Sequence, residues 1–278
     1  MIESVLERVW PEGVESVETL GGGITNHNFK VVAGGAAFVV RIGGKDTELL
    51  GIDRSVEHEA TLAAAKLGLG PEVVMFVEPE GYLVTRFVDG ETGKVTVEEA
   101  ARLLTRLHGA PRIAGRFDSF RVVETYAATA ASRGVIPTAA YTMAKAVADR
   151  IERRRGAYEL VPCHNDLLAA NFVGGVDRTW IVDWEYAGMG DPAFDLANFA
   201  VNNGLDEAGD ADLLEAYGGA DGDVHILMRF MSDFREAMWG VVQQAITELD
   251  FDFAGYADEH FDRLEATADE TRFGRALG

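Results

Sequence analysis

The amino-terminal third of the chain switches between helical and strand-like hydrophobic patterns. Residues 2–10 place apolar and acidic side chains at helical spacing and end before Pro11, which predicts a short opening helix. Two β-rich runs, at 29–33 and 37–42, flank the pair Gly34-Gly35, and this arrangement predicts a β-hairpin. We therefore expect the chain to begin with a helix and to continue into an antiparallel sheet.

The next segment adds a helix and two more strands to that sheet. An amphipathic run at 55–67 predicts a helix that ends at Gly68, because glycine readily adopts the backbone conformation that closes a helix. β-Rich runs at 73–77 and 82–88 are separated by a turn at Pro79-Glu80-Gly81. After residue 88 the chain leaves the sheet, so we place a lobe boundary there.

The remainder of the chain is mainly helical in pattern. Thr96 and Glu99 fit a capping box that opens a helix through Leu107. A helix start is expected at Asp191-Pro192, a buried strand at 180–182, and further helices at 138–153, 223–248 and 254–272. The sequence thus predicts an α+β fold of two lobes: residues 1–88 form a small antiparallel sheet with a helix, and residues 89–278 form a larger, mainly helical lobe.

Charge and cysteine content narrow the partners and the compartment. The chain has 46 Asp and Glu residues against 25 Lys and Arg residues, a formal net charge of −21 at pH 7. That charge repels nucleic acid and anionic membrane surfaces, so we expect neither as a partner. No apolar run approaches about eighteen residues, and no membrane insertion is expected. Cys163 is the single cysteine and is expected to pack as a small apolar residue, which fits a cytoplasmic protein.

The segment 161–185 carries the strongest chemical signal. His164, Asp166 and Asn171 form an H-x-D-x-x-x-x-N pattern, and Asp183 follows the expected strand. This layout is typical of a kinase-type site, in which one carboxylate accepts the proton of the attacking hydroxyl. An amide and a second carboxylate then hold magnesium against the nucleotide phosphates. The alternative is that these residues are ordinary loop caps and turn formers.

Two features of the first lobe fit the same chemistry. A glycine-rich stretch that starts at Gly21 and ends in Thr25 and Asn26 can let backbone N–H groups approach phosphates, although it can also be a simple turn. Arg41 ends a strand at the place where a kinase-type lobe carries a basic residue directed at phosphates. Glu57, in the first turn of the next helix, either pairs with Arg41 or only complements the helix dipole.

Taken together, the sequence resembles the choline/ethanolamine kinase branch of the aminoglycoside-phosphotransferase-like enzymes, which share the protein-kinase fold. Four motifs, spread over nearly the whole chain, carry the resemblance. They are Gly22-Gly23-Ile24-Thr25-Asn26, Cys163-His164-Asn165-Asp166 with Asn171, Ile181-Val182-Asp183-Trp184-Glu185-Tyr186, and Trp239-Gly240-Val241-Val242-Gln243 with Phe251 to Tyr256.

The resemblance implies ATP and Mg²⁺ as cofactors and assigns roles to the matching residues. Asp166 becomes the catalytic base, and Asn171 and Asp183 become the magnesium ligands. His164 and Asp195 brace the catalytic loop, and the backbone from Arg86 to Val88 holds adenine. The implied nucleotide-binding residues are Gly22, Gly23, Thr25, Asn26, Arg41, Glu57, Arg86 and Val88.

The resemblance also implies an aromatic and acidic pocket for a cationic substrate, held by cation–π attraction and carboxylate charge. The expected substrate-binding residues are Glu185, Tyr186, Glu236, Trp239, Phe253 and Tyr256. Family members often carry a second Trp three residues before Trp239, where this chain has Glu236. We therefore expect a preference for a primary amine or for a different cation. Phe253 is as well explained as a core residue.

The leading hypothesis is thus a small-molecule kinase, dependent on ATP and magnesium, that phosphorylates the hydroxyl of a small cationic amino alcohol of the choline or ethanolamine type. One alternative is an antibiotic phosphotransferase of the aminoglycoside type, and the block from Trp239 to Tyr256 argues against it. Another is a catalytically silent nucleotide-binding module, which the presence of Asp166, Asn171 and Asp183 disfavours. The sequence leaves the oligomeric state open.

Overall fold

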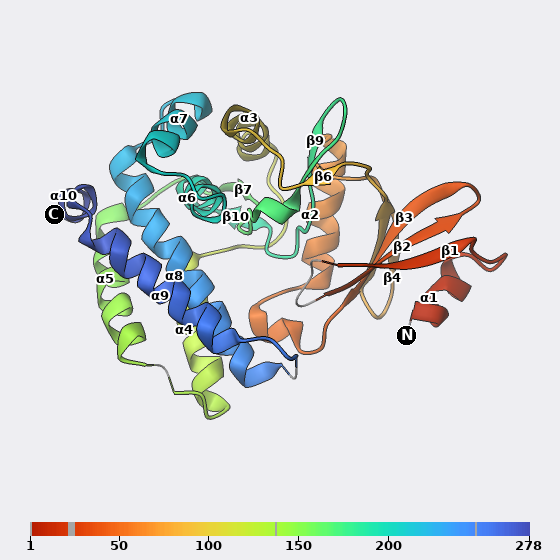
Figure 1. Cartoon of the computed structure of the whole chain (residues 1–278), viewed down its shortest axis with the longest axis horizontal. Coiled ribbons are helices and arrows are strands. Elements are labelled where there is room, and N and C mark those ends of the chain that lie inside the picture. The colour runs from red at the N-terminus through yellow and green to blue at the C-terminus, as the bar shows by residue number, and fades with distance from the viewer. Residues whose placement is uncertain (1, 22–25, 137, 248) are drawn as a thin grey trace.

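The structure is a computed structural model that describes residues 2–21, 26–136, 138–247 and 249–278. Figure 1 shows a sheet-containing lobe and a larger helical lobe that lie side by side along the long axis of the molecule. The predicted α+β, two-lobe architecture of the protein-kinase type is confirmed. No helix within the described ranges is long and apolar enough to cross a membrane.

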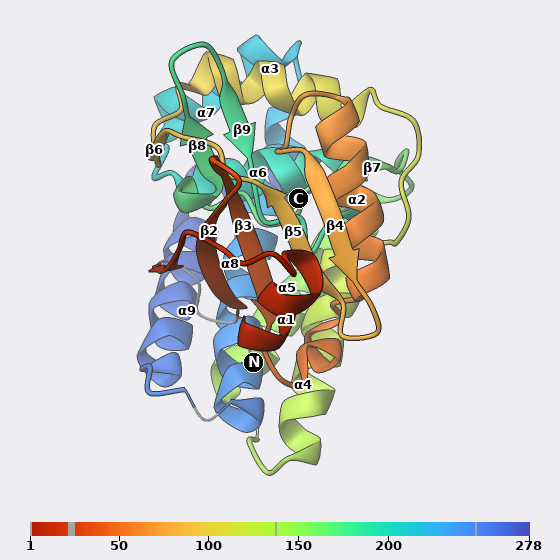
Figure 2. The same cartoon turned by 90° about the vertical axis from the view of Figure 1, so that its right-hand side faces the viewer.

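The small lobe is built on a five-stranded antiparallel sheet. Its strands are β1 (Ser16–Leu20), β2 (Asn26–Ala33), β3 (Ala36–Gly43), β4 (Val73–Val77) and β5 (Tyr82–Arg86), in the order β1-β2-β3-β5-β4. The predicted hairpin is present, with Ala33 opposite Ala36. Helix α1 (Ile2–Val9) covers the outer face of the sheet, where Val5 packs with Val31 and Val40 (Figure 2).

The connection from β3 to β4 ties the small lobe to the large one. It contains the short helix η1 (Thr47–Leu50) and helix α2 (Arg54–Lys66), which the Asp53 side chain caps. Leu50 and Ile52 pack into the apolar core of the helical lobe, and the Tyr126 hydroxyl donates a hydrogen bond to the Leu50 carbonyl at 3.1 Å. The lobes therefore share one core here, and the division after residue 88 stays a prediction.

Helix α8 is the centre of the large lobe, because it is buried along most of its length and packs against α4, α6 and α9. The helices are α3 (Val97–His108), α4 (Ser119–Ser132), α5 (Ala139–Arg155), α6 (Pro192–Asn202), α7 (Glu207–Tyr217), α8 (Gly222–Ile246), α9 (Phe253–Asp269) and α10 (Thr271–Leu277). Thr96 caps α3 as predicted, since its side chain accepts a hydrogen bond from the Glu99 N–H at 3.2 Å. The single helix expected at 254–272 is wrong, because Glu270 has an extended backbone that separates α9 from α10.

Two small sheets hold the catalytic segment between the lobes. Strand β7 (Val161–Cys163) pairs with β10 (Gly188–Gly190), while β6 (Glu91–Thr92), β8 (Phe172–Gly174) and β9 (Thr179–Ile181) form the other sheet. The short helix η2 (Ala169–Asn171) joins the catalytic loop to β8. Both ends of segment 161–185 are thereby fixed by backbone hydrogen bonds.

Candidate active site

The carboxylate of Asp195 holds the loop that follows β7. Asp195 on α6 accepts hydrogen bonds from the backbone N–H of His164 at 2.9 Å and of Asn165 at 2.7 Å. Asn165 has a left-handed backbone, with φ of 66°, a conformation that Asn tolerates better than most residues. The His164 ring binds the Val182 carbonyl at 3.0 Å. The expected bracing by His164 and Asp195 is confirmed, and it fixes the position of Asp166.

The residues around this brace are structural. His108 at the end of α3 contacts Asp195 at 3.0 Å and the Tyr217 hydroxyl at 2.8 Å, so it is a packed histidine. Cys163 is buried, and burial raises the pKa of its thiol well above the usual value. A neutral buried thiol is a poor nucleophile, which agrees with the expected packing role.

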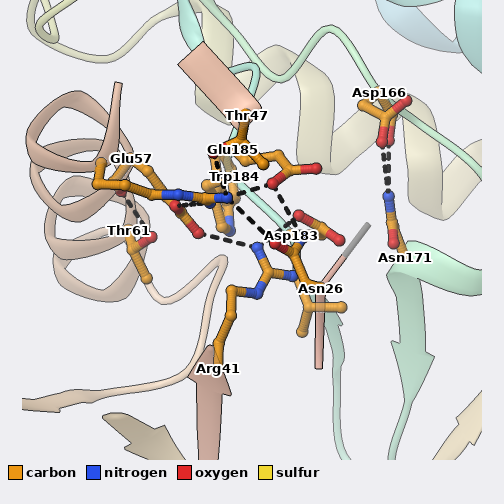
Figure 3. Close-up of polar contacts among 12 residues, drawn as sticks. Asn26, Arg41, Thr47, Glu57, Thr61, Asp166, Asn171, Asp183, Trp184 and Glu185 are labelled. Atoms are coloured by element: carbon orange, nitrogen blue, oxygen red, sulfur yellow. Dashed lines mark hydrogen bonds and ion pairs between the residues drawn. The ribbon is translucent and has the colours of Figure 1, made fainter. Parts of the chain in front are cut away.

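Asp166 contacts Asn171 (Figure 3), and Asn171 and Asp183 line the same cavity. The amide nitrogen of Asn171 donates to the Asp166 carbonyl at 2.8 Å and to its carboxylate at 3.4 Å, which leaves the amide oxygen to bind a cation. The Val182 N–H donates to the Asn171 carbonyl and fixes the start of the Asp183 turn. Amide and carboxylate oxygens are the ligands that Mg²⁺ prefers, so these residues fit that ion.

Arg41 reaches Asp183 from strand β3. Its Nη1 lies 2.8 Å from Glu57 Oε1 and 2.6 Å from Asp183 Oδ1. The predicted pair of Arg41 and Glu57 is therefore present, and the contact with Asp183 is new. Burial disfavours the ionised carboxylate, but the Arg41 guanidinium outweighs it and lowers the pKa of Asp183. Asp183 is thus held as a carboxylate, the form that binds a metal ion.

A second arginine, Arg54, lies beside this pair and was not foreseen from the sequence. Its Nη1 contacts Glu57 at 2.6 Å and Glu185 at 3.1 Å, and its Nη2 contacts Asn26 at 3.1 Å. The Asn26 amide in turn donates to Glu185 at 2.9 Å (Figure 3). Asn26, expected near phosphate, thus has its side chain in this network. The spacing of Arg54 and Glu57 on one helix was the available signal.

A cavity of about 370 Å³ opens beside these groups at the base of the sheet. Its lining includes Gly21 and most of the residues expected to bind nucleotide and metal, namely Arg41, Glu57, Arg86, Val88, Asn171 and Asp183. The structure thus brings residues from both lobes together around one nucleotide-sized space. The expected phosphate-binding residues Gly22, Gly23 and Thr25 lie outside the described residues.

Three of the aromatic residues expected to bind the acceptor, Trp239, Phe253 and Tyr256, gather where α8 meets α9. The ring centroid of Trp239 lies 5.7 Å from that of Phe253 and 5.4 Å from that of Tyr256. The Tyr256 hydroxyl donates to Glu236 Oε2 at 2.9 Å. Phe253 is only 3% exposed and belongs to the core of the helical lobe, so its packing agrees with the core alternative.

Arg235 connects this group with the catalytic loop, and it too was missed from the sequence. The side chain is buried, with Nη1 at 3.1 Å from Asp166 Oδ1 and 2.5 Å from Glu236 Oε1. Its guanidinium carbon lies 4.4 Å from the centre of the Tyr186 ring. Sequence neighbours on a helix rarely meet, so nothing in the sequence pointed to a pair between Arg235 and Glu236.

Two buried carboxylates here have shifted pKa values. Burial raises the pKa of Asp166 to about 7, although Arg235 opposes the shift. Burial also raises the pKa of Glu185 to about 7, and the neighbouring Asp183 charge adds to the effect.

A second cavity, of about 610 Å³, is lined by Glu185 and Tyr186 together with Tyr126 of α4. Such shifts in a cleft are typical of functional sites.

The comparisons with known proteins all lead to phosphotransferases. The model of the phosphotransferase enzyme family matches residues 16–234. Protein LicA of Haemophilus influenzae is 30% identical over 210 residues, 70% of this chain and 61% of that protein. The chain thus spans less than two thirds of this relative. A thiamine kinase of Escherichia coli is 28% identical over 209 residues, covering 72% of this chain and 71% of that enzyme.

The same agreement holds in three dimensions. The crystal structure of a choline/ethanolamine kinase family protein from Mesorhizobium loti matches with a TM-score of 0.84 at 30% identity. The match covers 99% of this chain and 96% of that one. With the family model matching well over half of the sequence, the chain belongs to the phosphotransferase enzyme family, the enzyme class that its catalytic motifs predict.

Proposed function

We propose that this protein is a kinase that uses ATP and Mg²⁺ to phosphorylate the hydroxyl of a small cationic alcohol. One observation carries the proposal. Asp166 contacts Asn171 on the side of the nucleotide-sized cavity, and it contacts Arg235 on the side of the aromatic group formed by Trp239 and Tyr256. A base between a nucleotide site and an acceptor site is the arrangement that phosphoryl transfer requires.

Each of these residues has one role in the phosphoryl transfer. The acceptor hydroxyl attacks the terminal phosphorus of ATP, its proton goes to the Asp166 carboxylate, and ADP leaves. A base with a pKa of about 7 is well matched to this task near neutral pH. Asn171 and Asp183 are the ligands for Mg²⁺, which when bound neutralises phosphate charge. Arg41, oriented by Glu57, is placed to contact the phosphates.

The chemical class of the acceptor follows from the aromatic rings and carboxylates on the Arg235 side of Asp166. Aromatic rings and carboxylates attract a positive group while the hydroxyl lies near the base. Proteins similar to this chain include a thiamine kinase and a choline/ethanolamine kinase family protein. Choline, ethanolamine and thiamine are all cations with a primary hydroxyl at physiological pH. We therefore infer this chemical class, with choline-type and ethanolamine-type alcohols as its leading members and thiamine as the second candidate.

The test is the release of ADP over a panel of acceptors. The panel contains choline, ethanolamine, thiamine, the neutral alcohol 3,3-dimethylbutan-1-ol and the aminoglycoside kanamycin. We expect turnover with at least one cationic small alcohol, dependent on Mg²⁺ and lost in Asp166→Asn. Turnover with kanamycin alone would reassign the protein to antibiotic modification. ATP binding without turnover of any acceptor would instead support a silent nucleotide-binding module.

A further inference from the structure

The acceptor side of the site already contains a cation, the guanidinium of Arg235. It is 1% exposed and has three neighbours that a bound ammonium group would also seek. These are the Tyr186 ring at 4.4 Å, the Asp166 carboxylate at 3.1 Å and the Glu236 carboxylate at 2.5 Å. A positive group over an aromatic face with carboxylates around it is the geometry expected for a cationic ligand.

The carboxylates on this side have protein donors. Glu236 Oε1 accepts from Arg235 and its Oε2 from the Tyr256 hydroxyl at 2.9 Å. Glu185 Oε2 accepts from Asn26 and Arg54. A positive substrate group entering this site therefore meets acidic groups that already have partners, and it meets one aromatic face that is already covered.

We propose that Arg235 is the specificity-determining residue of the acceptor site, where its guanidinium competes with the positive group of the substrate for Tyr186 and Glu236. The inference rests on the proposed function, because it concerns the cationic acceptor of that reaction. Nε and Nη2 of Arg235 have no hydrogen-bond partner among the described residues. The stack on Tyr186 and the two contacts of Nη1 thus hold the guanidinium in place.

The competition affects two kinds of substrate differently. A quaternary ammonium group has no N–H, so its binding depends on aromatic faces and on net charge. With one face of Tyr186 covered by Arg235, such a group on this side is left with Trp239 and Tyr256, which also pack on each other. A primary ammonium group has three N–H donors and can share the oxygens of Glu236 with Arg235. The wild-type protein should therefore favour primary amino alcohols over choline.

The experiment measures the selectivity for positive charge as a ratio. It compares kcat/KM for choline with kcat/KM for 3,3-dimethylbutan-1-ol, which has the same shape without the charge. Because both values come from one preparation, the ratio does not depend on the fraction of folded enzyme. Removing the internal charge in Arg235→Met should raise the ratio about tenfold, which lies within the range of one cation–π contact. Arg235→Lys keeps the charge and should leave the ratio close to that of the wild type.

A second variant and a matched control guard against loss of folding. Arg235→Met leaves two buried carboxylates without their partner, whereas Arg235→Gln keeps an N–H donor for them and should also raise the ratio. Arg229 lies on the same helix, paired with Asp210 at 2.6 Å instead of with the site. Arg229→Met should lower stability and leave the ratio unchanged. An unchanged ratio in both Arg235→Met and Arg235→Gln would overturn the proposal.

Calorimetric binding of choline separates this inference from the proposed function. If the wild type phosphorylates no amino alcohol, the proposed function fails, but the choline affinity of Arg235→Met and Arg235→Gln still tests the competition. Tighter binding in these variants by about tenfold supports Arg235 as an internal competitor. Equal or weaker binding in both contradicts it, whatever the reaction is.

Discussion

The nucleotide side and the acceptor side of this site both pair arginine with carboxylates, but they differ in the space around the arginine. On the nucleotide side, Arg41 and Arg54 hold carboxylates at the edge of a cavity of about 370 Å³, and Arg41 is among the residues that line it. On the acceptor side, Arg235 is buried against an aromatic ring and occupies carboxylates itself. The first side leaves an open space beside its paired arginines, while the second already contains the kind of group that it is expected to bind.

This difference suggests where specificity is determined. Phosphate binding needs positive charge around an open space, and on the nucleotide side Arg41 lines such a space together with Asn171 and Asp183, whose oxygens suit Mg²⁺. Selection among alcohols depends on competition within a packed interior, where a single charge changes the balance between substrates. The four changes below test this division, from the largest expected effect on activity to the smallest.

Asp166→Asn should abolish the reaction and leave both sides able to bind. The change removes the base but keeps the size of the side chain, so we expect turnover to fall by roughly a hundredfold or more. Nucleotide affinity, measured by calorimetry with ATP and Mg²⁺, should stay close to that of the wild type. Turnover near the wild-type rate would show that another group accepts the proton.

Arg41→Ala should weaken the nucleotide side alone. A hydrogen bond to a charged group contributes about 1.5–3 kcal/mol, so we expect at least a tenfold rise in the apparent ATP constant. Glu57→Ala should have a smaller effect in the same direction. If the two act as a pair, the double variant should be no worse than Arg41→Ala, whereas additive losses would make Glu57 only a helix-start residue.

Trp239→Ala should weaken the acceptor side alone. Loss of one cation–π face should raise the acceptor KM by about tenfold, with no change in the ATP constant. Trp180→Ala is the control, because Trp180 lies on β9 and its ring contacts Arg178 instead. If both constants rise together in Trp239→Ala, the two sides are not separate.

Asp210→Asn should change stability without affecting either side. Asp210 is buried among Arg229, Arg272 and His225, and although burial opposes ionisation, these partners lower its pKa. The carboxylate therefore stabilises the fold above its unfolded pKa of about 3.9, and this contribution is lost as the pH falls through the lower folded value. We expect a loss of roughly 3 kcal/mol in urea unfolding at pH 7, with the gap to wild type closing under acid conditions. Activity per folded molecule should not change.

The sequence predicts the parts of this protein whose residues are close together in the chain. The hairpin, the Thr96 cap and the spacing of His164, Asp166 and Asn171 are local patterns, and the structure contains them. Helices α4 and α7 were not predicted, although Asp118 and Asp206 cap them in the way that a sequence pattern could have indicated. Their weakly amphipathic, alanine-containing sequences gave no clear hydrophobic stripe.

Contacts between residues that are far apart in the chain could not be predicted from the sequence. Glu57 was a candidate partner for Arg41 because a helix start follows that strand. Nothing local related Arg235 to Asp166, which is 69 positions away in the chain. The sequence shows that Glu236 stands where family members often carry an aromatic residue. Its hydrogen bonds with Arg235 and Tyr256 depend on how α8 packs against α9 and the catalytic loop, which the sequence does not show. A sequence can supply the charges of such a site, but only the fold decides which charges neutralise one another.

The packing of Leu50 into the helical core also limits how the lobes can move. A lobe joined to its neighbour by one length of chain is free to swing about many axes. Here the segment between β3 and β4 is attached to the helical lobe at two places. Leu50 and Ile52 are anchored on α4 through Tyr126, and Ala60, Ala64 and Leu69 share a core with Leu103 and Trp184. A swing of the small sheet together with α2 would have to unpack both cores. Ligands should therefore enter and leave this cleft with little movement of the lobes.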